Sequence, residues 1–279
     1  MEAAIHELVP PPDTPPQRLH AAMRHSMEAG GKRIRPMLLL AAADIFPADA
    51  DPMPAAVALE CLHTYTLIHD DLPSVDDSDL RRGQPSCHAK FGEATALLAG
   101  DALLTLAFEL LATRYADHPT LAAALVRELA TAAGSRRLIG GQMADILGET
   151  QRLDADALRD IHANKTAALI EAALAMGLRF GEPDEAALAA IRRAGHHIGL
   201  SFQIIDDILD ATSDSGALGK PTGNDAATGK NTYVALYGIE GARGEARTHT
   251  RTALSETATI GGDHTALDAL VRELEQRIA

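Results

Sequence analysis

An all-helical fold is predicted by the composition of the chain, by the spacing of its apolar residues and by its lack of alternating segments. Aromatic residues make up 3% of the 279 residues and tryptophan is absent, whereas alanine and leucine are abundant. β-Strands favour β-branched and aromatic residues, so this composition favours helices. No segment alternates convincingly between apolar and polar residues with period two. We therefore expect an all-α fold.

Apolar residues recur at helical intervals along most of the chain, and proline or glycine marks the breaks between these segments. The predicted helices cover residues 21–29, 35–43, 55–69, 94–115, 120–134, 156–178, 185–212 and 232–255. No short repeat and no shift in composition divides the chain. A single domain over residues 1–279 is the simplest expectation.

The net charge and the cysteines argue against some classes of function. A formal net charge of −14 argues against nucleic acid or an anionic membrane as a general partner. The only two cysteines, Cys61 and Cys87, form neither a CxxC motif nor a disulfide framework, which is typical of reduced cytosolic thiols. The N-terminus is acidic and proline-rich, and we find no apolar run of membrane-spanning length. We expect a soluble, cytoplasmic protein without a membrane span.

Two aspartate clusters lie within long apolar stretches of the sequence. The first contains Asp70, Asp71, Asp76 and Asp77, and the second contains Asp206, Asp207 and Asp210. Burying an ionised carboxylate without a partner is costly, so clustered acids in such a setting indicate bound cations. Mg²⁺ prefers oxygen ligands and is usually shared with substrate phosphates. The clusters therefore predict magnesium sites for a phosphate-bearing substrate.

The second cluster lies on a helix that is apolar on both sides of its acids. Gln203, Asp206, Asp207 and Asp210 fall within an arc of roughly 100° on a regular helix. Ile204 and Ile208 flank this arc, and neither Lys nor Arg occurs between Gly195 and Gly219. We expect the acids to face an internal cavity. The alternative is an ordinary solvated face, which usually carries basic residues as well.

The first cluster contains Pro73, which cannot continue an undisturbed helix. Asp70 and Asp76 are six residues apart and would point about 120° apart on a regular helix. A kink at Leu72-Pro73 would bring Asp76 back beside Asp70. The alternatives are an acidic loop at a helix end and, less favoured, a calcium loop, whose sequence pattern is missing.

Basic residues follow a pattern that suits a diphosphate. Lys32 and Arg35 are neighbours on one predicted helical face, and Arg81 and Arg82 follow the first acidic cluster directly. Arginine can donate two hydrogen bonds at once to a phosphate. Lys165, Lys220 and Lys230 add further positive charge, the last two in a glycine-rich stretch that we expect to form a mobile lid. Taken singly, each of these residues is more often a solvated surface charge.

Seven strings of the sequence carry a resemblance to a known family: GGKRIRP, ECLHTYTLIHDDLPSVDDSDLRRGQPSCH, LAGDALL, GGQMADI, HANKTAALI, FQIIDDILD and LGKPTGND-TGKNTY. The chain resembles the trans-isoprenyl diphosphate synthases, most closely their bacterial farnesyl type. The resemblance implies a bundle of long, mostly antiparallel helices around a central active-site cavity. It also implies a homodimer.

The reaction that the resemblance implies is a head-to-tail condensation. An allylic diphosphate ionises, and the double bond of isopentenyl diphosphate attacks the resulting cation before a proton is lost. The expected product is (2E,6E)-farnesyl diphosphate, and geranylgeranyl diphosphate is the alternative. Two rivals are a class I terpene cyclase and a non-catalytic partner subunit. The low aromatic content and the second basic group disfavour the cyclase, and the presence of both acidic clusters disfavours the subunit.

The resemblance also implies roles for individual residues. Three Mg²⁺ ions would be held by Asp70, Asp71, Asp76, Asp206 and Asp210. The allylic diphosphate would contact Arg81, Lys165 and Lys220, with Lys230 nearby, and isopentenyl diphosphate would contact Lys32, Arg35, His63 and Arg82. Thr166 and Gln203 would place polar oxygens close to the carbocation. His69, His196 and His197 are expected to be core residues, and Asp145 a supporting one.

Product length is expected to depend on Tyr65, which lies five residues before Asp70, roughly 7.5 Å back along the helix axis. In the bacterial farnesyl type, an aromatic residue here occurs together with two extra residues in the first cluster, and this sequence has both features. Thr66 is small and leaves more depth than a second aromatic would. Fifteen carbons are expected, with twenty as the alternative. The alternative for Tyr65 is a simple core aromatic.

Overall fold

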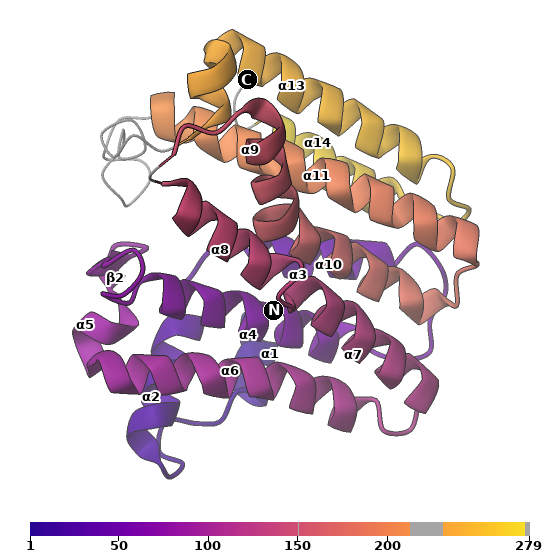
Figure 1. The fold of residues 1–279 in the computed structure, drawn as a ribbon. Coiled ribbons are helices and arrows are strands. Elements are labelled where there is room, and N and C mark those ends of the chain that lie inside the picture. Colours follow the sequence, from indigo (N-terminus) through magenta and orange to yellow (C-terminus); the bar gives the residue numbers. More distant parts are fainter. Residues whose placement is uncertain (150, 213–230, 277–279) are drawn as a thin grey trace. The chain divides into compact units, whose positions relative to one another are not determined.

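The computed structural model describes residues 1–149, 151–212 and 231–276, and it is helical almost throughout this part (Figure 1). Its elements, in order, are α1 (Glu2–Leu8), α2 (Gln17–Met27), α3 (Ile34–Ala43), α4 (Met53–Asp70), β1 (Leu80–Arg81), β2 (Gln84–Pro85), α5 (Cys87–Phe91), α6 (Glu93–Arg114), α7 (Pro119–Ala133), α8 (Leu138–Gly148), α9 (Ala155–His162), the π-helix η1 (Ala163–Ala167), α10 (Ala168–Leu178), the 3₁₀-helix η2 (Arg179–Gly181), α11 (Glu185–Thr212), α13 (Tyr233–Thr257) and α14 (Thr265–Gln276). The predicted all-α class is confirmed.

The sequence located the long helices well and the short elements poorly. The helix predicted over residues 185–212 has the same bounds as α11. Helices α1, α5, α8 and α14 and the β1–β2 hairpin were not predicted. Three of these helices have no more than 11 residues, which gives a periodic apolar pattern little room to emerge.

The described residues divide into two compact units. The first contains residues 1–37 and 51–126, and the second contains residues 38–50, 127–149, 151–212 and 231–276. In the first unit α4 packs along α6 and also contacts α1 and α2. Every residue of α4 from Ala55 to Leu62 is buried, which makes α4 the core helix of this unit.

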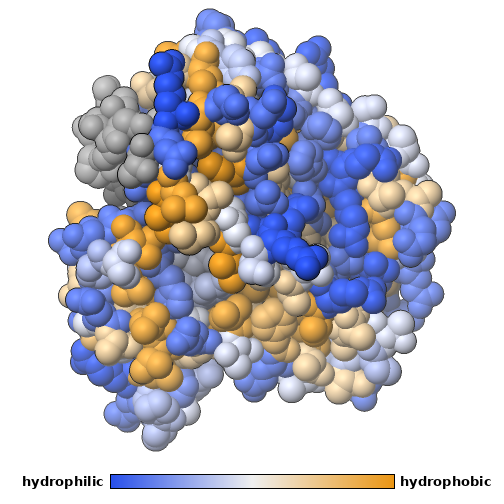
Figure 2. Space-filling view, in the orientation of Figure 1, coloured by the Kyte–Doolittle hydropathy of each residue, from blue (hydrophilic) through white to orange (hydrophobic). Residues whose placement is uncertain are grey.

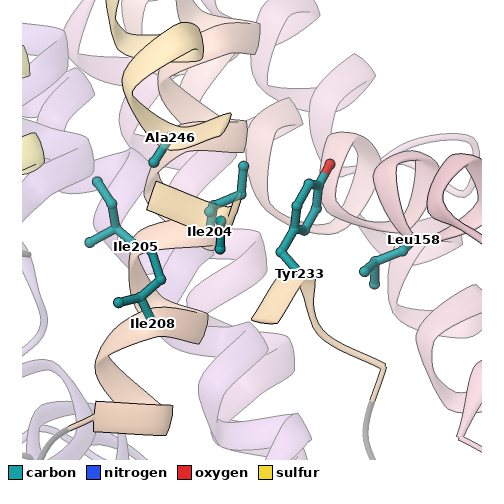
Figure 3. Close-up of a cluster of buried hydrophobic side chains, with 7 residues drawn as sticks. Leu158, Ile204, Ile205, Ile208, Tyr233 and Ala246 are labelled. Carbon is teal, nitrogen blue, oxygen red and sulfur yellow. The ribbon is translucent and has the colours of Figure 1, made fainter. Parts of the chain in front are cut away.

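The second unit is built around α11, which packs against α10, η1 and α13. A buried cluster joins α9, α11 and α13, and it consists of Leu158, Ile204, Ile205, Ile208, Tyr233, Ala242 and Ala246. Figure 3 shows the ring of Tyr233 between Leu158 of α9 and Ile204 of α11. The apolar positions of α11 therefore anchor the helix that carries the second aspartate cluster.

Helix α6 differs from expectation in one respect. With 22 residues it is long and apolar enough to cross a membrane, and 44% of its most apolar window is buried in the structure. The expectation that no apolar run reaches membrane-spanning length was therefore wrong, because α6 meets the criteria of length and composition. The core helices of soluble proteins pass the same test. Leu97 and Leu98 of α6 are about half exposed. Hydrophobic side chains also lie on the face of the molecule that Figure 2 shows.

Candidate active site

The first aspartate cluster forms a tight loop at the end of α4. After Asp70 the chain turns at Leu72, whose carbonyl accepts hydrogen bonds from the N–H groups of Val75 (2.9 Å) and Asp77 (3.1 Å). The backbone N–H of Asp76 donates to the carbonyl of Asp70 at 2.8 Å. The predicted return of Asp76 toward Asp70 is therefore confirmed at the level of the backbone.

Asp71 points into the first unit and binds Arg81. Its carboxylate is buried, and the Nε of Arg81 lies 3.0 Å from each of its oxygens, while Nη2 donates to Oδ1. Burial by itself would lower the pKa of Arg81, but the hydrogen bonds and charge of Asp71 raise it above the ordinary value. Asp71 thus holds the arginine that sequence analysis assigned to the allylic diphosphate.

The β1–β2 hairpin presents two consecutive arginines in different directions. Arg81 pairs with Gln84, and the two residues between them, Arg82 and Gly83, have positive φ angles of 54° and 75°. Two positive φ angles in a two-residue loop match the twist of a tight hairpin. Arg82 donates to the carbonyl of Gly30, and a Cβ added at Gly31 would lie 2.5 Å from the Cζ of Arg82. The hairpin and the segment before α3 therefore meet at this guanidinium.

Arg33 anchors that segment, and sequence analysis overlooked it. Its buried guanidinium donates to Glu60 at 2.6 Å, to Glu2 at 2.8 Å and to the carbonyl of Met27 at 2.6 Å. Lys32, the preceding residue, is exposed. The available signal was the carboxylate of Glu60 within the apolar run of α4, because a buried acid requires a cationic partner.

His63 lies on α4 two turns before Asp70 and faces the arginines of this unit. Arg35 donates from Nη1 to the Nε2 of His63 at 3.2 Å. Burial lowers the pKa of His63 well below its usual range, and the charges of Arg35 and Arg82 lower it further. The imidazole is therefore neutral at pH 7. Arg35, His63 and Arg82, which sequence analysis assigned to one diphosphate, belong to one electrostatic group.

The two residues assigned to product length are both on α4. Tyr65 is buried, and its ring contacts that of His69 at a centroid distance of 5.6 Å. Burial raises the pKa of Tyr65 to about 12, and the charge of Asp70 adds to this effect. The hydroxyl of Thr66 donates to the carbonyl of His63 at 2.7 Å. His69 Nε2 lies 3.0 Å from the carbonyl of Leu97 on α6, and its side chain, which was expected in the core, is only partly buried.

In the second unit, Lys165 and Thr166 lie in the π-helix η1, where the chain changes from α9 to α10. π-Bulges are rare and occur frequently at functional sites. A Cβ added at Gly141 of α8 would lie 2.3 Å from the backbone N of Lys165, and one at Gly199 of α11 would lie 2.3 Å from Ala167 Cα. Two glycines thus allow α8 and α11 to pack directly against the backbone of η1.

The side chains of η1 contact both neighbouring helices. Lys165 donates to Asp145 Oδ2 on α8 at 2.5 Å. The hydroxyl of Thr166 donates to Gln203 Oε1 on α11 at 2.8 Å, and Gln203 Nε2 donates to Asp207 Oδ1 at 3.1 Å. The structure therefore joins Thr166 and Gln203, the two residues that sequence analysis placed together. It adds Asp145 as a partner of Lys165, and Asp207 as a partner of the glutamine.

Replacing Gly199 with alanine is expected to destabilise the second unit by about 1–3 kcal/mol, because the new methyl group would overlap the backbone of η1. Gly244→Ala in α13 is the matched control, since no atom lies within 4 Å of the added Cβ. Alanine in a helix interior is favoured over glycine by about 0.5–1 kcal/mol, so this control should gain stability. Urea unfolding measures the free energy of unfolding of both variants. Equal effects in the two variants would contradict the close approach.

The acids of α11 separate into two groups. Asp206 and Asp210 are one helical turn apart and half-buried, whereas Asp207 is buried. Within the described part of the chain, no three His, Cys, Asp or Glu side chains are arranged to hold a metal by themselves. Mg²⁺ is commonly bound by one or two carboxylates, several waters and substrate phosphates, so these oxygen ligands fit it. Lys220 and Lys230, with the glycine-rich stretch that was expected to be a lid, lie outside the described residues.

A family model described as polyprenyl synthetase matches residues 16–270 of the chain. The chain belongs to the polyprenyl synthetase family. The family resemblance read from the sequence motifs is therefore confirmed.

Individual members of the polyprenyl synthetase family are similar over nearly the whole chain. Farnesyl diphosphate synthase of Escherichia coli strain K12 is 45% identical over 264 residues, which cover 91% of this chain and 88% of that protein. The chloroplastic geranylgeranyl pyrophosphate synthase 11 of Arabidopsis thaliana is 42% identical, with coverages of 95% and 76%. A crystal structure of a geranyltransferase from Helicobacter pylori, in complex with magnesium and isoprenyl diphosphate, matches with a TM-score of 0.85, 35% identity and coverages of 99% and 93%.

Proposed function

We propose that this chain is a magnesium-dependent prenyltransferase that condenses isopentenyl diphosphate with dimethylallyl or geranyl diphosphate to give (2E,6E)-farnesyl diphosphate. Membership of the polyprenyl synthetase family and the similarity to a farnesyl diphosphate synthase support this reaction. In this proposal, residues 1–279 form a single polyprenyl synthetase domain. The enzyme acts in the cytoplasm as a homodimer.

One observation supports a two-substrate condensation above the other readings. The first unit holds the aspartate loop at the end of α4 and, two helical turns earlier, the Arg35–His63 pair. Arg82 adds a further cation to that pair. A cyclase that binds one diphosphate needs the aspartates but has no evident need for a second basic group. An enzyme that binds two diphosphates requires both the aspartates and the second basic group.

We propose that Mg²⁺ is bound by the carboxylate oxygens of Asp70, Asp76, Asp206 and Asp210. Asp71 is a further candidate ligand, although its carboxylate binds Arg81 in this structure. Three ions are expected in all. Bound magnesium would supply Lewis-acid stabilisation of the charge that develops on the departing diphosphate oxygens. The magnesium in the similar Helicobacter pylori geranyltransferase supports magnesium as the metal.

The protein's own groups bind and orient the two substrates in this proposal. Arg81 and Lys165, together with Lys220 and Lys230, would contact the allylic diphosphate, and Lys32, Arg35, His63 and Arg82 would contact isopentenyl diphosphate. Arg81 and Lys165 are held in place by Asp71 and Asp145, respectively. The oxygens of Thr166 and Gln203 would lie close to the allylic cation, where a partial negative charge stabilises it.

The proposed reaction is tested by incubating the purified chain with isopentenyl diphosphate, Mg²⁺ and either dimethylallyl or geranyl diphosphate. We expect a prenyl diphosphate of fifteen carbons, and no product when EDTA removes the metal. A cyclic hydrocarbon from the allylic substrate alone would indicate a terpene cyclase. No turnover with any allylic substrate would exclude the proposed function.

Geranylgeranyl diphosphate is the second candidate product, and the similarity to a geranylgeranyl pyrophosphate synthase favours it. The buried ring of Tyr65, one and a half turns before Asp70, favours the shorter product because a growing prenyl chain that runs back along α4 would meet it. The two candidates are separated by the main product of the wild-type enzyme.

Replacing Tyr65 with alanine is expected to move the main product from fifteen to twenty or more carbons, because the ring that stops the chain is removed. Tyr65→Phe is the matched control, which keeps the ring and should keep the fifteen-carbon product. Products are measured by chromatography after removal of the diphosphate. An unchanged product length in Tyr65→Ala would assign the ring to simple core packing.

A further inference from the structure

Asp207 of α11 is a buried acid, and both of its oxygens receive hydrogen bonds from the protein. Its side chain is only 6% exposed. Oδ1 accepts from Gln203 Nε2 at 3.1 Å, and Oδ2 accepts from the backbone N–H of Tyr233 at 2.9 Å. An ionised carboxylate is purely an acceptor, so it can receive both bonds at once.

These bonds decide which end of the Gln203 amide faces Thr166. A glutamine amide has an oxygen that accepts and an NH₂ that donates, and the two ends have nearly the same shape. Because Asp207 receives the NH₂ end, the oxygen end lies toward Thr166 and accepts its hydroxyl proton at 2.8 Å. The hydrogen-bond order is therefore Thr166 to Gln203 to Asp207.

Asp207 is itself fixed from the far side. Tyr233 is the first residue of α13, so its N–H lies at a helix N-terminus, where a negative charge is favoured. The hydroxyl of Thr232 caps the same helix by accepting from the N–H of Ala235. The ring of Tyr233 is held in the buried cluster between Leu158 and Ile204 (Figure 3). The carboxylate therefore has a rigid support.

We propose that Asp207 is a positioning residue that keeps the oxygen end of the Gln203 amide directed toward the allylic cation. This inference rests on the proposed function, in which Thr166 and Gln203 lie beside that cation. A carbonyl oxygen stabilises a developing positive charge, whereas an amide NH₂ in the same place opposes it. Asp207 thus acts on catalysis through Gln203 without being a metal ligand.

Asp207→Asn tests the inference because it changes one acceptor into a donor with almost no change in shape. If the remaining oxygen stays with the N–H of Tyr233, the new NH₂ faces Gln203, whose amide must turn over to accept from it. The NH₂ of Gln203 would then face Thr166. We expect kcat to fall about 10- to 100-fold, with KM for both substrates within about threefold of the wild-type value.

Two further variants separate positioning from general damage. Asp268→Asn in α14 is the matched control, because Asp268 is a half-buried acid that accepts from Thr257 and contacts His264, and kcat should not change. The double variant Gln203→Glu with Asp207→Asn restores an oxygen acceptor facing Thr166, because the new carboxylate accepts both from Thr166 and from the NH₂ introduced at position 207. Its kcat should exceed that of either single variant. A double variant no better than the poorer single one would contradict the inference.

The amide orientation is also measurable without turnover. With ¹⁵N-glutamine labelling, the side-chain NH₂ signal of Gln203 is identified by its loss in Gln203→Glu. It should shift strongly in Asp207→Asn and not in Asp268→Asn. An unshifted signal, or an unchanged kcat in an enzyme that condenses normally, overturns the inference. A wild-type chain that forms no prenyl diphosphate overturns the proposed function instead, whatever the signal shows.

Discussion

Asp70→Ala is expected to lower kcat/KM for condensation by about 10³-fold or more while leaving the fold intact. The removed carboxylate is a proposed ligand of the magnesium that stabilises the departing diphosphate, a contribution of several kcal/mol to the transition state. Each 1.36 kcal/mol corresponds to a factor of about ten in rate. Steady-state kinetics with geranyl diphosphate measures the loss.

Asp206→Ala is expected to produce a loss of the same order, since Asp206 is the proposed ligand in the second aspartate cluster. Asp117→Ala is the control, because Asp117 is an exposed acid in the turn between α6 and α7. Circular dichroism and thermal unfolding establish that each variant is folded. Near-normal turnover in either cluster variant would remove that aspartate from the metal site.

Arg33→Met is expected to destabilise the first unit by about 3–5 kcal/mol, because it leaves the carboxylate of Glu60 buried without its cation. Methionine keeps most of the apolar length of the arginine stem, so the loss reports mainly on charge. The segment that carries Lys32 and Arg35 loses its anchor in the same step. Affinity for isopentenyl diphosphate should therefore fall as well.

A double variant distinguishes an unpaired buried charge from lost packing as the cause of the lost stability. In the double variant Arg33→Met with Glu60→Met, no buried charge remains, and much of the lost stability should return. Urea unfolding of the wild type, both single variants and the double variant gives the coupling between the two residues. If the two single losses simply add, the pair contributes no coupling and this explanation of Arg33 is wrong.

Long helices with periodic apolar residues could be located from the sequence, and the chemistry of the aspartate clusters could be predicted from it. The kink near Pro73 was predictable because proline interrupts a helix and six residues place two aspartates on different faces. The separate roles of the aspartates within each cluster could not be predicted. Asp71 and Asp207 look like their neighbours in sequence, but their partners, Arg81 and Tyr233, come from other elements of the chain.

The short elements escaped prediction for a related reason. The β1–β2 hairpin has two residues in each strand, which is too few to show alternation. The π-helix around Lys165 has no signature in its own residues. Its close packing against α8 and α11 requires Gly141 and Gly199, which lie on those helices. Local patterns cannot report a conformation that is set by distant neighbours.

The proposal that both aspartate clusters bind a magnesium diphosphate is tested most directly by calorimetric titration of geranyl thiolodiphosphate, whose sulfur bridge resists ionisation. We predict binding by the wild type in Mg²⁺, no binding in EDTA, and strongly weakened binding in Asp70→Ala and in Asp206→Ala. Equal affinity with and without Mg²⁺, or wild-type affinity in both variants, would contradict the account.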